Sequence, residues 1–150
     1  MMKIKNRDRL ISVGDIEARR IVLDIIESSL QSLDVYDTTR NLLSLDGNIL
    51  RIGNLGWDIK QKRRLLVIGA GKASGSMAKA VEETLGDRIN GGLVIVKELN
   101  PGDKLKRIEL VVGGHPLPNK EGLLGSKRIL NMVEQATSED LFISVIRVCL

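Results

Sequence analysis

The stretch that decides the fold is LLVIGAGKASGSMAKAVEETL, residues 65–85. It opens with an unbroken apolar segment, Leu65 to Ile68, of the kind found in a strand that is buried on both faces. Glycines follow at positions 69, 71 and 75, and apolar residues then recur at helical spacing from Met77 to Leu85. Gly86 stands where a glycine often ends a helix. The stretch therefore predicts a strand, a glycine-rich loop and a helix, in that order.

Further apolar segments continue this pattern toward the carboxyl end. Residues 93–96, 108–112 and 141–146 predict three more buried strands. Before the last of them, Asn119 is placed to cap a helix whose apolar residues run from Leu123 to Val133. Helices that alternate with short apolar strands are typical of a parallel sheet with right-handed crossovers. We therefore predict an α/β fold, with a Rossmann-like, doubly wound parallel sheet over residues 64–146.

The amino-terminal third of the chain carries weaker signals. Residues 1–14 form a charged leader, and apolar residues at spacings of three and four predict an amphipathic helix over 15–33. The Asp46-Gly47 pair between short apolar segments predicts a hairpin over 45–52. We expect all of these elements to belong to a single domain over residues 1–150.

Composition excludes several classes of protein. The 150 residues, 43% of them apolar and 28% charged, suit one compact domain and exclude a disordered or collagen-like chain. A net charge of +4 with only three aromatic residues argues against nucleic-acid binding. A single cysteine, Cys149, excludes a disulfide scaffold and indicates a reducing compartment. Because no apolar stretch approaches the ~20 residues of a membrane span, we expect a cytoplasmic protein with no membrane partner.

The glycine-rich loop is the first candidate site. Glycines let a ligand approach the backbone closely, and the free amides at the start of the next helix attract an anion. A lysine in the first helical turn opposes the helix dipole by about 0.3–1 kcal/mol, which is best explained by a phosphate or carboxylate bound beside it. A close turn with a solvated lysine is the alternative. The predicted site residues in this loop are Gly69, Ala70, Gly71, Lys72, Ala73 and Ser74.

This loop differs from two common phosphate-binding motifs. It is not a Walker loop, because Leu66 stands at the position of the first glycine and Ala73 replaces Ser or Thr. As a dinucleotide fingerprint its G-x-G-x-x-x-G spacing is one residue too long, although Glu98 follows the next strand where a ribose-binding acid would stand. Ser74 lacks a G-x-S-x-G context, so we predict a phosphate ligand or helix cap, and no nucleophile.

The second candidate site is GGHPLP, residues 113–118, directly after the predicted strand at 108–112. Two glycines and two prolines make a rigid loop at the edge of the sheet where ligand sites form. Gly114 and His115 are the predicted binding residues here, with His115 able to hydrogen-bond a substrate or to transfer a proton. The alternative is that His115 only holds the turn together. No zinc-type ligand spacing is present, so we predict no metal site.

Four segments taken together resemble a known family: LLVIGAGKASGSMAKA (65–80), GGLVIVKE (91–98), VVGGHPLPNKEG (111–122) and DLFISVI (140–146). They are similar to the amino-terminal part of the glycerate 2-kinases of the MOFRL type, some of which are labelled hydroxypyruvate reductases. The resemblance covers residues 15–146. It implies phosphorylation of D-glycerate, the anionic substrate, on its 2-hydroxyl by ATP accompanied by Mg²⁺. It also implies a catalytic role for Lys72, in a cleft between two domains, whereas contact between His115 and the substrate is our inference from its loop.

The end of the chain departs from that family. Its members are longer, with a glycine- and serine-rich loop after the fourth strand and a second domain, and here Arg-Val-Cys-Leu occupies residues 147–150. We therefore expect a truncated amino-terminal domain, as a frameshift would produce, with a sheet that is incomplete at its carboxyl end. We expect no kinase activity from this chain alone. The uncovered edge of the last strand predicts association with a partner at that edge.

Three alternatives to the kinase stay open. A phosphosugar-binding domain of the sugar isomerase type has a similar strand, loop and helix, but Ala73 and the GGHPLP loop count against it. An NAD(P)-dependent hydroxypyruvate reductase is supported by the glycine spacing and by the label that some relatives carry. The third alternative is an inert fragment whose only property is association with a partner.

Overall fold

The computed structural model describes residues 3–32, 34–99 and 103–147, and it divides the chain into two compact units. Unit 1 is Met1–Asp34 and unit 2 is Val35–Leu150. The sequence analysis predicted a single domain over residues 1–150. A helix that makes few tertiary contacts has no sequence feature that distinguishes it from a helix packed into the rest of the chain. The two units are described separately below.

Unit 1 is a pair of helices, α1 (Arg7–Leu10) and α2 (Ile16–Ser32). The predicted leader thus contains a short helix, whose four residues are too few to show a period. The predicted helix over 15–33 is α2, and position 33 lies outside the described residues. Asp15 precedes α2 and accepts a hydrogen bond from the Ala18 amide at 3.0 Å, which caps the helix.

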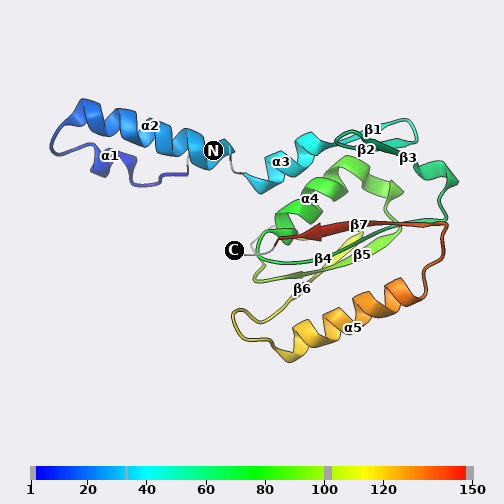
Figure 1. Ribbon diagram of the computed structural model, residues 1–150. Helices are drawn as coiled ribbons and strands as arrows, with labels where there is room; N and C mark the ends of the chain where they lie inside the picture. Colours follow the sequence, from blue (N-terminus) through cyan, green and yellow to red (C-terminus); the bar gives the residue numbers. More distant parts are fainter. Residues whose placement is uncertain (1–2, 33, 100–102, 148–150) are drawn as a thin grey trace. The chain divides into compact units, whose positions relative to one another are not determined.

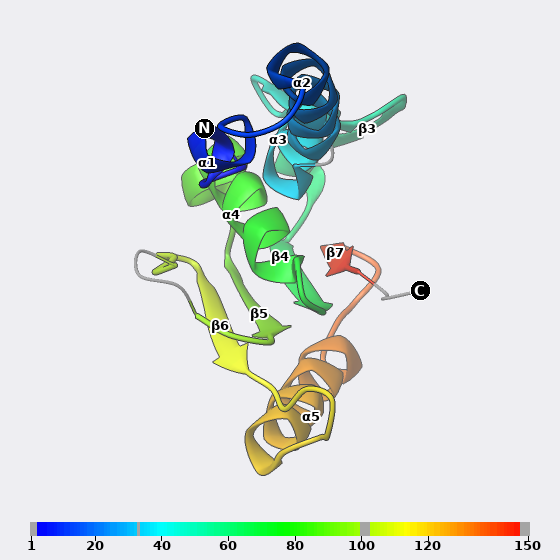
Figure 2. The ribbon, with the colours of Figure 1, turned by 90° about the vertical axis from the view of Figure 1, so that its left-hand side faces the viewer.

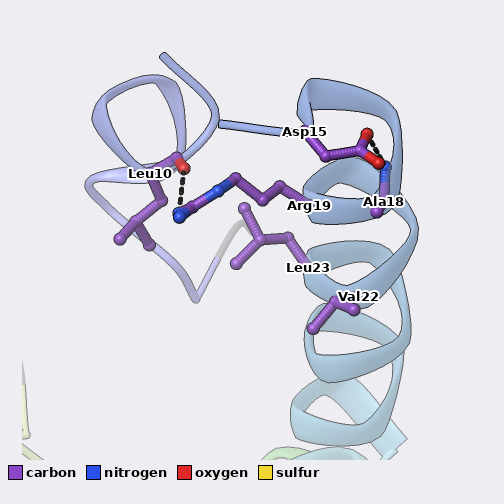
Figure 3. Close-up of a pocket in the computed structure, with 6 residues that line it drawn as sticks. All are labelled: Leu10, Asp15, Ala18, Arg19, Val22 and Leu23. Atoms are coloured by element: carbon purple, nitrogen blue, oxygen red, sulfur yellow. Dashed lines mark hydrogen bonds between the residues drawn. The ribbon is translucent and has the colours of Figure 1, made fainter. Parts of the chain in front are cut away.

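A hollow of about 420 Å³ lies between these two helices, lined mainly by apolar side chains such as Leu10 and Leu23 (Figure 3). Its polar groups already have partners within the unit. Arg19 donates to the Leu10 carbonyl at 3.1 Å, and Asp15 caps α2. Because no unpaired polar group faces it, we assign no chemistry to this hollow.

Unit 2 begins with a helix and a small antiparallel sheet of order β1-β2-β3. These elements are α3 (Val35–Leu42), β1 (Leu43–Asp46), β2 (Ile49–Ile52) and β3 (Leu55–Asp58). The predicted hairpin over 45–52 is therefore part of a larger structure that includes a third strand and a helix. The strand was missed because it has only four residues, one of them Gly56, and so shows little β-propensity.

The main sheet has four parallel strands in the order β6-β5-β4-β7 (Figure 1), which confirms the predicted α/β class. Its elements are β4 (Arg64–Ala70), α4 (Ser74–Leu85), β5 (Gly91–Val96), β6 (Ile108–Val112), α5 (Lys120–Glu134) and β7 (Asp140–Ile146). Short 3₁₀ turns, η1 (Ile59–Gln61) and η2 (Gly86–Arg88), precede β4 and follow α4. Two predicted helix ends are also confirmed, since Gly86 ends α4 with φ +51° and Asn119 caps α5.

Helices cover both faces of this sheet (Figure 2). Neighbouring residues of β5 show this directly, because side chains alternate between the two faces of a strand. A Cβ on Gly125 of α5 would lie 3.2 Å from Ile95, whereas a Cβ on Gly75 of α4 would lie 3.3 Å from Val96. The strand order reverses beside β4, since β5 and β6 lie on one side of it and β7 on the other. Ligands of open α/β sheets bind at the carboxyl ends of the strands at such a reversal.

A cluster of ion-paired side chains lies at the opposite, amino-terminal ends of β4 and β7. The carboxylate of Asp140 is fully buried and accepts hydrogen bonds from Arg63 at 2.6 and 3.0 Å and from Arg64 at 2.8 and 3.1 Å. It also accepts the Thr137 amide at 2.9 Å. The Arg64 and Arg63 guanidinium groups hold the pKa of the Asp140 carboxyl far below its ordinary value of 3.8. This cluster therefore binds the two strands at the register that pairs Arg64 with Asp140.

We expect Asp140→Asn to lower the urea midpoint of unfolding at pH 7, because the amide leaves two arginines with one neutral acceptor. Asp87→Asn is the matched control, since the side chain of Asp87 is 94% exposed and forms a solvent-exposed ion pair with Arg107, and its midpoint should stay within error of the wild type. The pKa of Asp140 is lowered by folding, so its stabilisation is complete above about pH 4 and is lost as the pH falls below 3.8. The difference between wild type and Asp140→Asn should shrink accordingly in acid. Equal midpoints for the two variants at pH 7 would contradict this role.

Candidate functional site

Three chain segments leave the carboxyl edge of the sheet next to one another. They are the turn after β4, the segment after β5 and the loop after β6, and together they enclose a hollow of about 190 Å³. Its lining residues are Ala70, Gly71, Lys72, Ile95, Val96, Lys97, Gly113, Gly114 and His115. The structure therefore brings both predicted motifs into a single site.

The turn after β4 depends on Gly71. Its φ is +135°, and a Cβ there would overlap the carbonyl oxygen of Arg147, so only glycine fits. The Gly71 amide donates to the Ile95 carbonyl at 3.1 Å, and its carbonyl accepts the Ser74 amide at 3.2 Å. These two hydrogen bonds stabilise the three-residue turn that connects the end of β4 to the first turn of α4.

The amino terminus of α4 is open toward this turn. Ala73 is its N-cap residue and makes no side-chain capping bond. The first amides of a helix have no carbonyl partner within it, and the helix dipole adds positive charge at the same place. Lys72 lies immediately before the cap and lines the hollow. An anion bound here would meet both backbone amides and an ammonium group.

Ser74 adds a buried hydroxyl beneath the turn. The residue is fully buried, and within the part of the chain that the structure describes its Oγ is the one buried side-chain polar atom without a hydrogen-bond partner. This oxygen lies 3.2 Å from the position of a Cβ on Gly71, so it is directed back toward the glycine turn. An unsatisfied buried hydroxyl costs about 1–3 kcal/mol. A ligand oxygen that entered the turn would remove that cost.

The loop after β6 is held by Asn119. Its Oδ1 accepts the Gly114 amide at 2.8 Å and also the Gly122 amide at 2.8 Å, so one side chain joins the loop to the first turn of α5. The Gly113 amide donates to the Val96 carbonyl at 2.8 Å, which attaches the loop to β5. His115, followed by a cis peptide bond to Pro116, then projects from this fixed base and lines the hollow.

We expect Asn119→Ala to destabilise the protein by about 1 kcal/mol, the usual cost of removing a helix cap, and to weaken anion binding at the hollow because the loop amide loses its acceptor. Asn119→Asp keeps an oxygen acceptor for both amides and should preserve binding. The readouts are the urea midpoint and the dissociation constant of inorganic phosphate. If Asn119→Ala binds phosphate as well as Asn119→Asp does, the loop does not contribute to the site.

The predicted site residues separate into two groups. Ala70, Gly71, Lys72, Gly114 and His115 line the hollow. The other three do not line it: Gly69 lies inside β4, Ala73 caps α4, and Ser74 is buried beneath the turn. Their roles in ligand binding stay predictions.

Lys97 joins the site as a residue that the sequence analysis did not single out. It directly follows the last residue of β5 and lines the hollow with Lys72 and His115. Its position one residue beyond a buried strand was the available signal, since polar groups at the carboxyl ends of parallel strands meet at one edge.

The ionisable groups of the hollow would favour an anion. Its ionisable lining residues are Lys72, Lys97 and His115, and its lining contains no carboxylate. A volume of about 190 Å³ is below the ~300–1,000 Å³ of typical pockets for drug-sized ligands, so it suits a phosphate or a small carboxylate, or one end of a larger ligand. Within residues 3–32, 34–99 and 103–147, no group of three or more His, Cys, Asp or Glu side chains could hold a metal ion.

A parallel sheet with helices on both faces and a glycine-rich turn at its strand-order reversal defines a doubly wound α/β protein. The chain belongs to the family described as Domain of unknown function (DUF4147), which matches residues 21–147. This confirms the predicted relationship to the amino-terminal part of glycerate 2-kinases and hydroxypyruvate reductases. Among the described residues, no helix has the length and apolar content to cross a membrane.

Three of the relatives that match this chain carry names that describe an activity. The chain is 29% identical over 125 residues to the glycerate 2-kinase of Pyrococcus horikoshii, covering 83% of this chain and 27% of that protein. It is 32% identical over 77 residues to the D-glycerate 2-kinase of Thermotoga maritima, covering 51% and 18%. A putative hydroxypyruvate reductase of Agrobacterium vitis is 26% identical over 133 residues, covering 89% and 27%. The chain thus spans less than a third of the length of these relatives.

A solved structure has the same fold. The crystal structure of the PH0495 protein from Pyrococcus horikoshii superposes with a TM-score of 0.69 at 28% sequence identity, over 88% of this chain and 29% of that chain. The four-stranded parallel sheet with flanking helices is therefore shared with an experimentally determined protein.

Proposed function

We propose that this chain forms the anion-binding part of a glycerate 2-kinase, which transfers a phosphoryl group from ATP to the 2-hydroxyl of D-glycerate. The observation that carries the proposal is the hollow at the strand-order reversal, where Lys72, Lys97, His115 and the amino terminus of α4 surround a space with no carboxylate in its lining. The names of the Pyrococcus and Thermotoga relatives supply the reaction.

The residues of the hollow suit this chemistry. Phosphoryl transfer requires little covalent participation from the protein and depends on positioning and on neutralising charge on the moving group. In the proposed mechanism Lys72 and the first amides of α4 bind the oxygens of that group, with the Ser74 hydroxyl beneath the turn as a further donor. Lys97 and His115, on the neighbouring segments, bind and orient the carboxylate and hydroxyl groups of glycerate.

The nucleotide fits this donor set through its phosphates. Mg²⁺ bound with ATP would neutralise charge between the phosphates. The described residues offer no ligand cluster for the ion, so the proposal assigns Mg²⁺ no protein ligand in this chain. The adenine and ribose extend beyond a hollow of about 190 Å³.

A reductase is the second candidate, because one feature of the sheet favours it. Glu98 lies two residues beyond β5, the strand next to the glycine turn, where a ribose-binding acid stands in dinucleotide-binding folds. The Agrobacterium relative carries the corresponding name. Against it, a lysine, Lys97, directly precedes this acid, and Lys72 within the glycine-rich loop is unusual for a dinucleotide-binding loop.

Calorimetric titration of the full chain separates these functions. We expect inorganic phosphate, D-glycerate and Mg-ATP each to bind, and phosphate to compete with Mg-ATP. If NADPH binds more tightly than Mg-ATP, the result favours the reductase function over the kinase function. Binding of glucose 6-phosphate without binding of glycerate would favour a phosphosugar module, and no binding of any of these anions would overturn the proposed site.

A further inference from the structure

The Ser74 hydroxyl is a buried polar group for which the fold provides no partner. Ser74 is 0% exposed, and among the described residues its Oγ is the one buried side-chain polar atom that makes no hydrogen bond. The Thr84 hydroxyl of the same helix, by contrast, donates to the Ala80 carbonyl at 2.8 Å. A buried hydroxyl without a partner destabilises the folded chain, so a serine at this position requires an explanation.

The amino terminus of α4 places backbone donors beside this hydroxyl. The first α-helical hydrogen bond of α4 runs from the Met77 amide to the Ala73 carbonyl at 3.1 Å. The amides of Gly75 and Ser76 precede that bond, and a helix supplies no carbonyl to its first amides. Ala73 contributes no side-chain cap. The first turn of α4 therefore combines two backbone amides and one hydroxyl that can donate to a ligand.

Gly71 has no side chain that would separate the Ser74 hydroxyl from the turn. A Cβ at position 71 would lie 3.2 Å from Ser74 Oγ, and it would also overlap the carbonyl oxygen of Arg147, which follows β7. The Gly71 amide points the other way, to the Ile95 carbonyl of β5 at 3.1 Å. The hydroxyl therefore approaches the turn from the β7 side, whereas Lys72 lines the hollow on the β5 side.

Donors that surround a ligand from several directions favour a tetrahedral oxyanion. A phosphoryl group has three terminal oxygens that point away from one another, and each of them is a strong hydrogen-bond acceptor. A carboxylate has two oxygens in one plane. The Ser74 hydroxyl, the first amides of α4 and the Lys72 ammonium group belong to different sides of the glycine turn. This arrangement suits the three oxygens of a phosphoryl group better than the two of a carboxylate.

We propose that Ser74 determines the specificity of the glycine turn for a phosphoryl group, and that its hydroxyl, without a partner in the free chain, donates to an oxygen of this group in the complex. The inference rests on the proposed function and deepens it, because it distinguishes the phosphoryl position at the turn from the carboxylate position at Lys97 and His115. It also implies a trade-off, since the same hydroxyl destabilises the free chain and stabilises the complex.

Ser74→Ala separates this role from a structural one. Loss of a hydrogen bond to a charged oxygen should weaken the binding of inorganic phosphate to the full chain by about 10- to 100-fold in calorimetry. The binding of D-glycerate should be unchanged, because other residues bind its carboxylate. In urea, the folded-to-unfolded ratio of the free chain should rise by about 5- to 30-fold, because a buried hydroxyl without a partner has been removed. Removal of a hydroxyl that the fold needs would lower that ratio.

Ser76→Ala is the matched control, since Ser76 lies two residues further along α4 and is exposed. It should bind phosphate as the wild type does, and its urea midpoint measures the gain from the higher helix propensity of alanine alone. Ser74→Ala should be more stable than this control.

Three results would overturn the inference. They are equal phosphate affinities for Ser74→Ala and Ser76→Ala, a Ser74→Ala chain that is no more stable than Ser76→Ala, and an equal loss of phosphate and glycerate affinity in Ser74→Ala. If the wild-type chain binds no phosphate, the proposed function and this inference both fail. If it binds phosphate but not glycerate, the proposed reaction alone fails, and the phosphate affinities of the two variants still decide the role of Ser74.

Discussion

Lys72→Met is expected to weaken the binding of inorganic phosphate to this chain by about 10- to 100-fold. A hydrogen bond to a charged group contributes about 1.5–3 kcal/mol, and each 1.4 kcal/mol changes a dissociation constant by a factor of about 10. Methionine keeps most of the length of the lysine stem, so the change removes the ammonium group with little effect on packing. In a form of the protein that phosphorylates glycerate, loss of this group should lower kcat by about 10²- to 10³-fold, the effect of removing one preorganised donor.

Lys60→Met is the control for this change. Lys60 is exposed in the 3₁₀ turn before β4, at the opposite end of that strand from Lys72, so its substitution should leave phosphate binding unaltered. The wild-type advantage over Lys72→Met should also decrease as salt is raised, because the hollow is open to solvent and its charges are screened. Equal phosphate affinities for the two variants would remove Lys72 from the site.

Gly69→Ala is expected to produce the largest loss of stability, of about 1–3 kcal/mol. Gly69 lies inside β4, and a Cβ there would overlap the carbonyl oxygen of Val145 in the neighbouring strand β7, so these two strands would have to move apart. The backbone of β7 cannot move away from the added methyl group as a flexible side chain could. The urea midpoint of unfolding measures the effect.

Gly91→Ala is the control for the strand glycine. Gly91 is in β5, and the nearest atom to its added Cβ would be the side chain of Leu66 at 3.9 Å, an ordinary contact. Its stability should therefore stay within about 0.5 kcal/mol of the wild type. If Gly69→Ala were tolerated equally well, the close approach of β4 and β7 would not be required for the fold. The result also separates a packing role of Gly69 from its predicted role in binding. If Gly69 is needed for packing, Gly69→Ala is less stable to urea. If Gly69 is needed only for binding, Gly69→Ala stays as stable as the wild type but binds the anion more weakly.

The sequence predicted the elements of the main sheet well because their signals are local. The predicted strand at 108–112 matches β6 residue for residue, although only Ile108 of it is buried, and Asn119 and Gly86 mark helix ends through their own side-chain and backbone chemistry. The elements it missed, α1, α3 and β3, have four to eight residues each. A segment of that length completes only one or two periods, so its pattern is not distinguishable from chance.

For the candidate site, the sequence identified both motifs and Lys72, because glycines at a strand end and a lysine beside the start of a helix each favour a bound anion. The structure places Lys72 immediately before the N-cap residue of α4, and not within the first helical turn as the sequence predicted. The sequence could not bring the motifs together. The hollow exists because β5 lies between β4 and β6 and places Lys97 between the two loops. Strand order determines this arrangement, and strand order cannot be predicted from the residues of any single segment.

By itself, then, the sequence determined which segments become the strands and helices of the main sheet, where the glycine turn falls, and to which family the chain belongs, since each of these depends on residues close together in the chain. Only the tertiary structure decided that β7 returns to the far side of β4, that the small sheet has three strands, and that Ile146 at the end of β7 stays exposed. The physical reason is that these features arise from pairing and burial between residues far apart in sequence, where many arrangements satisfy the local preferences and packing selects one of them.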